Sequence, residues 1–296
     1  MDLMVFGHAT AVRGQFMNYF QGKNIYITGG SSGIGLEIAR RLAAEGAHLL
    51  LFARTASKLE EARRDIETRW SGSGQKLAAM PLDVSDDPAV RRVMDRAVRE
   101  FGPPDILITS AGIGSADYFE NITYEAFDAV MKINLYGTRN MIAALLEPLK
   151  ARRGHVAIIS SVAGYLGMFG YTAYGTSKFA LVGFADCIRG ELKRHGVRLT
   201  LACPPETDTP FLVEESKTIP PQSRALKDIA GRLSPEVVAA RVIRGIRKNS
   251  YLVIPGFRAR ALYLTQCYSP GWLSRLISDM TVARVDRKLR KGGHLN

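Results

Sequence analysis

The chain has 296 residues, 46% hydrophobic and 23% charged, an ordinary globular composition that can bury a sizeable core. Its net charge of +12 would suit nucleic acid or an anionic membrane, but no basic run is interleaved with aromatic residues, so we expect no nucleic-acid partner. The three cysteines form no CxxC pair and there are few histidines, which argues against a disulfide framework and a metal site.

The N-terminal segment, residues 1–23, lacks the cationic start of a signal peptide, and no stretch of the chain reaches the roughly 20 apolar residues of a transmembrane helix. With the cysteine usage, this favours a cytoplasmic setting. The apolar residues of the segment fall on one helical stripe, predicting an amphipathic helix: Val5, Ala9, Val12, Phe16 and Phe20. Met17 is an alternative start, which would leave residues 1–16 without a role.

From residue 24 onward, short apolar runs alternate with longer helical patterns. We predict strands at 24–29, 47–53, 76–83, 105–110, 155–160, 197–203 and 251–256. We predict helices at 34–45, 57–70, 88–101, 123–133, 135–151, 173–194 and 234–248. Nearly continuous apolar strands, each followed by a helix, indicate a parallel sheet covered on both faces. The sequence therefore predicts an α/β, doubly wound Rossmann fold of about seven strands, with a single domain over residues 24–256.

The glycine-rich stretch TGGSSGIG (28–35) lies between the first predicted strand and the first predicted helix. In a dinucleotide-binding loop, Gly29 would permit the tight turn, Gly33 would let the backbone approach a pyrophosphate, and Gly35 would allow close helix packing. The other loop residues predicted to bind a cofactor are Ser31, Ser32 and Ile34. The alternative is a glycine-rich turn that binds no ligand.

The end of the second strand indicates which dinucleotide binds. NAD-binding proteins usually carry an acid there, but here no acid precedes Glu60, whereas Arg54 and Lys58 are close by. A guanidinium suits a 2′-phosphate in charge and geometry, so we predict NADPH, the alternative being that Arg54 is solvated surface. Asp83 and Val84, at the end of the third strand, are expected to contact the adenine.

A candidate reaction centre follows the fifth predicted strand. Ser160 and Ser161 lie at its carboxyl end, where ligands bind in open α/β sheets, and Tyr174 and Lys178 lie one turn apart on the next helix. The lysine ammonium is expected to lower the tyrosine pKa from its ordinary value of about 10, which would make Tyr174 a proton donor and acceptor. Ser161 can hydrogen-bond a substrate oxygen, and Ser160 fits strand packing.

These motifs resemble the short-chain dehydrogenase/reductase family over roughly residues 24–256: TGGSSGIG, KINLYG with Asn134, Ser161 and YGTSK occur in the family's order. The resemblance implies that Tyr174 is the general acid and base, that Lys178 binds the nicotinamide ribose and tunes Tyr174, and that Ser161 orients the carbonyl. It also implies that Asn134 anchors a proton-relay water. Without the resemblance, Asn134 would be a polar residue bonded to local backbone.

Two further positions are assigned by the resemblance. Thr209 matches the family's threonine that contacts the nicotinamide amide. The family's NNAG sequence reads Thr109-Ser110-Ala111-Gly112 here, so its asparagine contacts are lost while Gly112 is kept as a cofactor-binding residue.

The region from SSVAGYLGMFGYTAYGTSKFA to CPPETDTPFLVEESKTIP is most similar to the branch of the family that reduces 3-ketosphinganine, a long-chain 2-amino-3-ketone, to sphinganine. The resemblance implies NADPH-dependent reduction in sphingolipid synthesis, and we expect Glu206 to meet the substrate amine because burying an unpaired cation is costly. The alternatives are a reductase or dehydrogenase of another lipid, such as a retinoid or steroid, or a non-catalytic dinucleotide-binding protein. We also expect a homo-oligomer, a dimer or tetramer.

The C-terminal extension, residues 257–296, carries eight basic residues against two acidic ones. Its apolar stretch 261–277 is interrupted by Pro270-Gly271 and flanked by arginines. Basic residues beside Trp, Tyr and Leu suit an interfacial helix, so the predicted location is cytoplasmic with peripheral contact to the cytoplasmic face of a membrane. The alternative is a helix pair that docks on the core or forms a dimer.

Overall fold

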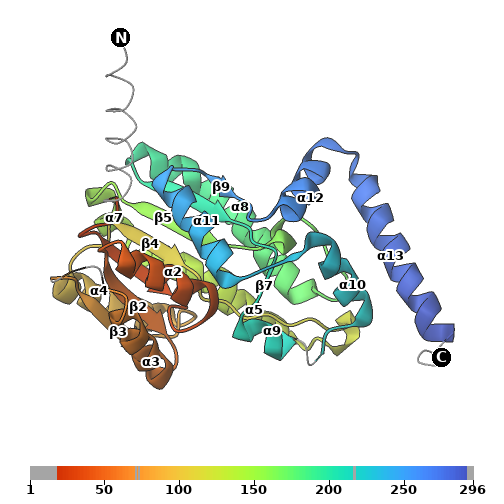
Figure 1. Ribbon diagram of the computed structural model, residues 1–296, viewed down its shortest axis with the longest axis horizontal. Helices are drawn as coiled ribbons and strands as arrows, with labels where there is room; N and C mark the ends of the chain where they lie inside the picture. Colours follow the sequence, from red (N-terminus) through yellow and green to blue (C-terminus); the bar gives the residue numbers. More distant parts are fainter. Residues whose placement is uncertain (1–18, 71, 73, 216–217, 292–296) are drawn as a thin grey trace, which may run out of the picture.

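Seven parallel strands form the central sheet of the computed structural model, which describes residues 19–70, 72, 74–215 and 218–291 (Figure 1). The strands are β1 (Asn24–Thr28), β2 (His48–Ala53), β3 (Leu77–Pro81), β4 (Ile106–Thr109), β5 (His155–Ile159), β6 (Arg198–Ala202) and β9 (Leu252–Val253). Their order in the sheet is β3-β2-β1-β4-β5-β6-β9. The chain reverses direction across the sheet between β3 and β4, which gives the doubly wound arrangement and confirms the predicted fold class.

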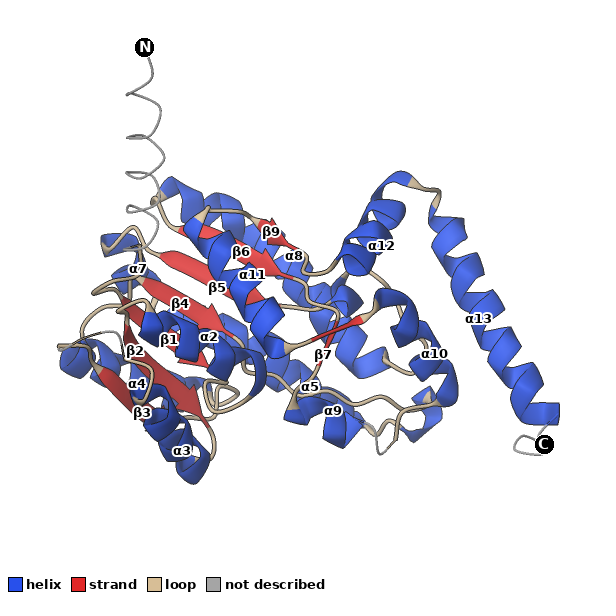
Figure 2. Ribbon diagram, viewed as in Figure 1, coloured by secondary structure: helices blue, strands red, loops and turns tan. Residues whose placement is uncertain are grey.

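Helices cover both faces of the sheet (Figure 2). One face packs against α2 (Gly33–Ala44), α3 (Ala56–Glu67) and α11 (Pro235–Arg247). The other packs against α4 (Asp87–Phe101), α6 (Gly137–Ala144), α7 (Leu146–Ala151) and α8 (Thr172–Arg194). Because successive strand residues point to opposite faces, Ile25 and Ile27 join the first core cluster while Tyr26 joins the second.

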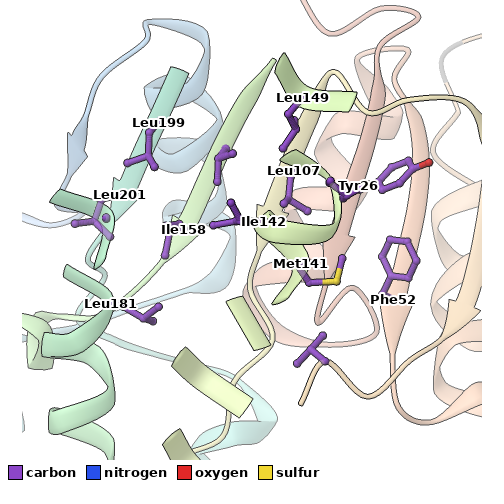
Figure 3. Packing of buried hydrophobic residues seen from close by; sticks show 14 of the residues in the cluster. Tyr26, Phe52, Leu107, Met141, Ile142, Leu149, Ile158, Leu181, Leu199 and Leu201 are labelled. Carbon is purple, nitrogen blue, oxygen red and sulfur yellow. The ribbon is translucent and has the colours of Figure 1, made fainter. Parts of the chain in front are cut away.

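The second cluster is built from strand residues and helix residues that interdigitate (Figure 3). Tyr26, Leu107 and Ile158 come from three neighbouring strands and meet Met141 and Ile142 of α6. All five are buried. This packing holds the carboxyl ends of β4 and β5 in fixed positions relative to the helices that follow them.

The two helices predicted at 123–133 and 135–151 are joined and further divided in the structure. This stretch consists of α5 (Tyr124–Met131), a π-helical turn (Lys132–Tyr136), α6 and α7. Asn134 lies in the π turn, a local widening of the helix that is frequent at functional sites.

A flap whose helices and strands were not among the predicted elements lies between β6 and α11. It contains β7 (Glu206–Thr207), α9 (Pro210–Glu215), α10 (Pro221–Ala230) and β8 (Arg232–Leu233), and β7 pairs with β8. The paired strands bring the start of the flap next to its end.

The C-terminal extension forms two helices, α12 (Phe257–Tyr268) and α13 (Gly271–Lys291), which we call the arm; α13 stands away from the sheet (Figure 1). The α12 helix is fastened by Tyr165, whose hydroxyl donates to the Ala259 carbonyl at 3.0 Å. The α13 helix packs beside α10, where Gln222 donates to Asp286 at 2.6 Å. Among the described helices, none is long and apolar enough to span a membrane.

Most of the predicted N-terminal stripe falls outside the described residues. Of its members, Phe20 is described, and it is fully buried in the first core cluster, with the Arg247 guanidinium 5.3 Å from its ring centroid. This residue therefore docks on the domain core.

Candidate active site

A cavity of about 210 Å³ opens at the carboxyl ends of β1, β4 and β5. Ten of the predicted site residues line it: Gly29, Ser32, Gly33, Ile34, Gly112, Ser161, Tyr174, Lys178, Glu206 and Thr209. Ser31, Gly35, Arg54, Lys58, Asp83, Val84 and Asn134 lie outside its lining. The fold thus brings the glycine loop and the candidate reaction centre to one cavity.

The glycine loop has the backbone shape that a phosphate-binding turn requires. Gly29 has a φ of 67°, and a Cβ there would lie 2.9 Å from backbone atoms of Ser110 and Ala111. A Cβ on Gly35 would lie 2.4 Å from the Gly29 carbonyl oxygen, so this glycine serves packing between the loop and α2. Gly33 opens α2 with a φ of 56° and lines the cavity. The N–H groups and positive potential of this helix terminus suit a dinucleotide's phosphates.

The segment after β4 is held by Thr28, at the end of β1. The Thr28 hydroxyl accepts hydrogen bonds from the backbone N–H groups of Ser110 and Ala111, both at 3.1 Å. A Cβ on Gly112 would lie 3.2 Å from Asn134 Oδ1 and 3.8 Å from Lys178 Nζ. A side chain at position 112 would therefore crowd the Asn134 amide.

Ser161 and Tyr174 both line the cavity, and the serine hydroxyl is near enough to influence the ionisation of the phenol. Burial raises the pKa of Tyr174 well above its usual range, and the Ser161 hydrogen bond partly opposes this rise. Ser161 Oγ also accepts the Ala163 N–H at 3.2 Å, which fixes the hydroxyl at the start of a short 3₁₀ turn. The phenol is therefore protonated at neutral pH and available as a proton donor.

Lys178 is 5% exposed, and its Nζ donates to the Ile159 carbonyl at 3.1 Å. Burial lowers the pKa of Lys178 to about 8. Its Nζ lies 5.5 Å from the centroid of the Tyr174 ring. The expected lowering of the Tyr174 pKa is wrong for this structure, because desolvation of the buried phenol outweighs the opposing influences.

Asn134 is fully buried and holds the segment after Gly112. Its Oδ1 accepts the Ile113 N–H at 2.9 Å, and its Nδ2 donates to the Ile113 carbonyl and to Ser177 Oγ, each at 2.9 Å. Its backbone carbonyl accepts the Thr138 hydroxyl at 2.9 Å. These contacts position the loop beside Lys178; an anchoring role toward a relay water stays a prediction.

The residues predicted to bind the adenosine half lie beyond the cavity, at the ends of β2 and β3. Arg54 and Lys58 are exposed. Burial alone would raise the pKa of Asp83, but hydrogen bonds from Ser85 and the charge of Arg54 lower it overall. Val84 is buried, and its carbonyl accepts Asn140 Nδ2 at 3.1 Å. Arg54 is thus exposed and lies close enough to Asp83 to influence its carboxyl group.

Glu206 lines the cavity, but its carboxylate is bound by two cations of the protein. Lys227 Nζ lies 2.5 Å from Oε2, and Arg232 Nε lies 3.6 Å from Oε1. A substrate amine would have to displace one of these partners. The prediction that Glu206 meets the amine therefore conflicts with its pairing, which no sequence pattern reveals because Lys227 and Arg232 follow in a separate helix and strand.

Sequence reasoning missed several residues of the cavity wall, among them residues of the flap and of the loop before α8. They include Met168, Tyr171, Phe211, Leu212 and Lys227. The Phe211 and Tyr171 rings lie 5.6 Å and 6.0 Å from the Tyr174 ring. Tyr171 could have been predicted from its place among the aromatic residues next to the YxxxK motif. No sequence feature of the flap helices indicated that Lys227 would line the cavity.

Residues 23–220 match the family model of short chain dehydrogenases. The chain belongs to the short-chain dehydrogenase family. It is therefore an oxidoreductase, and the cavity with the Ser161–Tyr174 pair is its candidate active site.

Curated and solved relatives agree with this assignment. The chain is 39% identical to 3-ketodihydrosphingosine reductase of Mus musculus over 232 aligned residues. The alignment covers 78% of this chain and 70% of the relative. Levodione reductase shares 27% identity at a TM-score of 0.74, over 82% of this chain and 99% of that one. An alcohol dehydrogenase from Thermococcus sibiricus, complexed with 5-hydroxy-NADP, shares 26% identity at a TM-score of 0.69, over 79% and 96%.

Proposed function

We propose that this enzyme uses NADPH to reduce 3-ketosphinganine to sphinganine. The observation that carries the proposal is the Ser161–Tyr174 hydroxyl pair, which lies in one cavity with the glycine loop. The similarity to the mouse reductase supports the choice of ketone, since the relative is named for that substrate.

In the proposed reaction the two hydroxyls bind the ketone oxygen from the same side. Ser161 donates a hydrogen bond that strengthens as negative charge develops on this oxygen. Tyr174, whose pKa is raised by burial, holds the proton and transfers it from its phenol oxygen to the developing alkoxide. The buried ammonium of Lys178 stabilises the phenolate that remains. The nicotinamide cofactor, when bound, supplies the hydride.

Different residues of the chain suit different parts of the cofactor. Gly29, Ser32 and Gly33 at the start of α2 suit the pyrophosphate, and Thr209, whose methyl lies 3.1 Å from a Cβ built on Gly33, faces the same cavity. Arg54 is exposed at the end of β2, where a 2′-phosphate would lie. Its charge favours NADPH over NADH, because guanidinium–phosphate hydrogen bonds are strong.

A long alkyl chain cannot lie wholly within this cavity, because 210 Å³ is below the roughly 300–1,000 Å³ of sites that enclose drug-sized ligands. The apolar residues Met168, Phe211 and Leu212 on its wall suit the first part of such a chain. Another lipid ketone, such as a retinoid or steroid, would use the same apolar wall. A substrate panel at fixed NADPH separates the two.

The arm is proposed to contact the anionic cytoplasmic surface of a membrane. Tyr268 and Trp272, at the junction of its two helices, are 86% and 57% exposed, and Leu276 and Met280 continue the exposed apolar face of α13. Arg284 and the basic residues after it follow on the same helix. Aromatic side chains at the headgroup level and basic residues near anionic lipids are typical of interfacial helices.

The decisive experiment is turnover of 3-ketosphinganine by the purified protein with NADPH. We expect stoichiometric NADPH oxidation and sphinganine formation, identified by mass spectrometry. Reduction of retinoid or steroid ketones without turnover of 3-ketosphinganine would replace the proposed substrate. Loss of all turnover in Tyr174→Phe is the matched control for chemistry at this site.

A further inference from the structure

A second charged group of residues, separate from the catalytic hydroxyls, occupies the flap side of the cavity. It comprises Glu206, Asp208 and Glu215 together with Lys227 and Arg232. Three carboxylates and two cations leave one net negative charge. Because Glu206, Glu215 and Lys227 all line the cavity, this unbalanced charge faces the space in which a substrate would lie.

Glu215 is the carboxylate of this group that is best placed for a ligand. Its side chain is 3% exposed, whereas the Glu206 side chain is 17% exposed and bound by both cations. Lys227 contacts Oε2 of Glu215. A carboxylate can accept hydrogen bonds at both oxygens, and Lys227 binds one oxygen of Glu215.

Tyr171 supplies a second observation at the same wall. The residue is 3% exposed, lines the cavity, and its hydroxyl is within hydrogen-bonding geometry of no described group. Burial, then the nearby charge of Glu215 and a hydrogen-bonding interaction with its carboxylate, raise the pKa of Tyr171 well above its usual range. A ligand that donates to the Tyr171 oxygen would complete the hydrogen bonding of this buried hydroxyl.

The distance to the reaction centre suits a group on the carbon next to a ketone. The Tyr171 and Tyr174 rings are 6.0 Å apart, and the charge of Glu215 reaches Tyr174, where it adds to the raised pKa of the phenol. A substituent on the carbon next to a ketone bound by Tyr174 can therefore turn toward Tyr171 and Glu215. An ammonium there would cancel the net negative charge of the group.

We propose that Glu215 and Tyr171 form the subsite for the substrate's ammonium, with Lys227 holding Glu215 in place. This proposal rests on the proposed function, because it takes the reacting ketone to carry an amine on the adjacent carbon. The ammonium donates to the free side of the Glu215 carboxylate and to the Tyr171 hydroxyl oxygen. Selectivity for a 2-amino ketone then comes from the flap rather than from the catalytic hydroxyls.

The test compares 3-ketosphinganine with a 1-hydroxy-3-ketone of the same chain length that lacks the amine. The measured quantity is the ratio of kcat/KM values for the two ketones. Glu215→Gln should lower this ratio roughly ten- to hundredfold, since a hydrogen bond to a charged group is lost, and Tyr171→Phe should lower it by a smaller factor. Asp228→Asn removes the same charge from the exposed side of α10 and should leave the ratio unchanged.

Several results would overturn the subsite. Equal losses on both ketones in Glu215→Gln would show that Glu215 only shapes the flap. A ratio that falls in Glu206→Gln and not in Glu215→Gln would move the amine to Glu206.

A variant-free measurement keeps the proposal testable if the flap variants do not fold. A long-chain primary amine should inhibit the wild-type enzyme at least roughly tenfold more strongly than the alcohol of equal length. Equal inhibition would overturn the subsite. The inhibition measurement also separates the two proposals. If the enzyme does not turn over 3-ketosphinganine but is inhibited preferentially by the amine, the proposed substrate is rejected and the ammonium subsite is kept.

Discussion

Lys178→Met should stabilise the protein at neutral pH while abolishing its activity. Lys178 is buried, and burial lowers its pKa from 10.5 to about 8. Holding the ammonium in this site therefore costs about 3 kcal/mol at pH 7. The substitution also removes the hydrogen bond to the Ile159 carbonyl, worth about 1 kcal/mol. The net gain in free energy of unfolding is expected to be about 2 kcal/mol.

The sign of the pH dependence identifies the cause. Between about pH 8 and 10.5 the unfolded chain binds the Lys178 proton and the folded protein does not, so the stability of the wild type rises with pH in this window. Relative to that of the variant, the free energy of unfolding of the wild type should rise by about 2 kcal/mol between pH 7 and pH 9.5. The advantage of Lys178→Met should therefore almost vanish at pH 9.5.

Urea unfolding of both proteins at pH 7 and pH 9.5 measures this difference, because all other titrating groups cancel between wild type and variant. Lys248→Met, at an exposed lysine, is the control and should change stability by less than about 0.5 kcal/mol at both pH values. A stability difference for Lys178→Met that does not change with pH would refute the buried-ammonium argument.

Three further outcomes are expected. Tyr174→Phe should lower turnover at least roughly 100-fold while NADPH affinity, measured by fluorescence titration, stays within about threefold; near-normal turnover would reject Tyr174 as the proton donor. Arg54→Ala should raise the KM for NADPH roughly tenfold or more and leave that for NADH unchanged, and equal wild-type efficiency with both cofactors would contradict this. Co-sedimentation with vesicles containing phosphatidylserine should fall when Tyr268 and Trp272 are replaced by Ser, and when salt is raised; loss of a dimer instead, in light scattering, would assign the arm to a second copy of the chain.

The sheet was predictable because its strands are buried on both faces and read as continuous apolar runs. NIYIT of β1 and HVAII of β5 show this directly, and the predicted boundaries differ from the observed ones by one residue at most for these two strands. The cofactor loop and the YxxxK pair were predictable because strand order places carboxyl ends at one edge of the sheet. Local sequence was sufficient for both.

The flap was not predictable because long-range contacts determine its structure. The strands β7 and β8 have two residues each and pair across most of the flap, and Lys227 on α10 joins Glu206 and Glu215 from two other elements. Such pairs leave no periodicity in the sequence. The prediction of a lowered Tyr174 pKa failed for a related reason. The YxxxK spacing shows that a cation is nearby, but it does not show the desolvation, which is the dominant effect and depends on how Phe211 and Tyr171 pack around the phenol.

The helix α10 connects the candidate active site with the arm. Lys227 and Ala230 line the cavity on one side of this helix, while Gln222 on the same helix donates to Asp286 of α13. Ser223 donates to the Phe169 carbonyl at 2.6 Å, which ties α10 to the loop that carries Tyr171. The arm therefore contacts a helix that also forms part of the cavity wall, and a surface that binds the arm would lie close to the candidate active site.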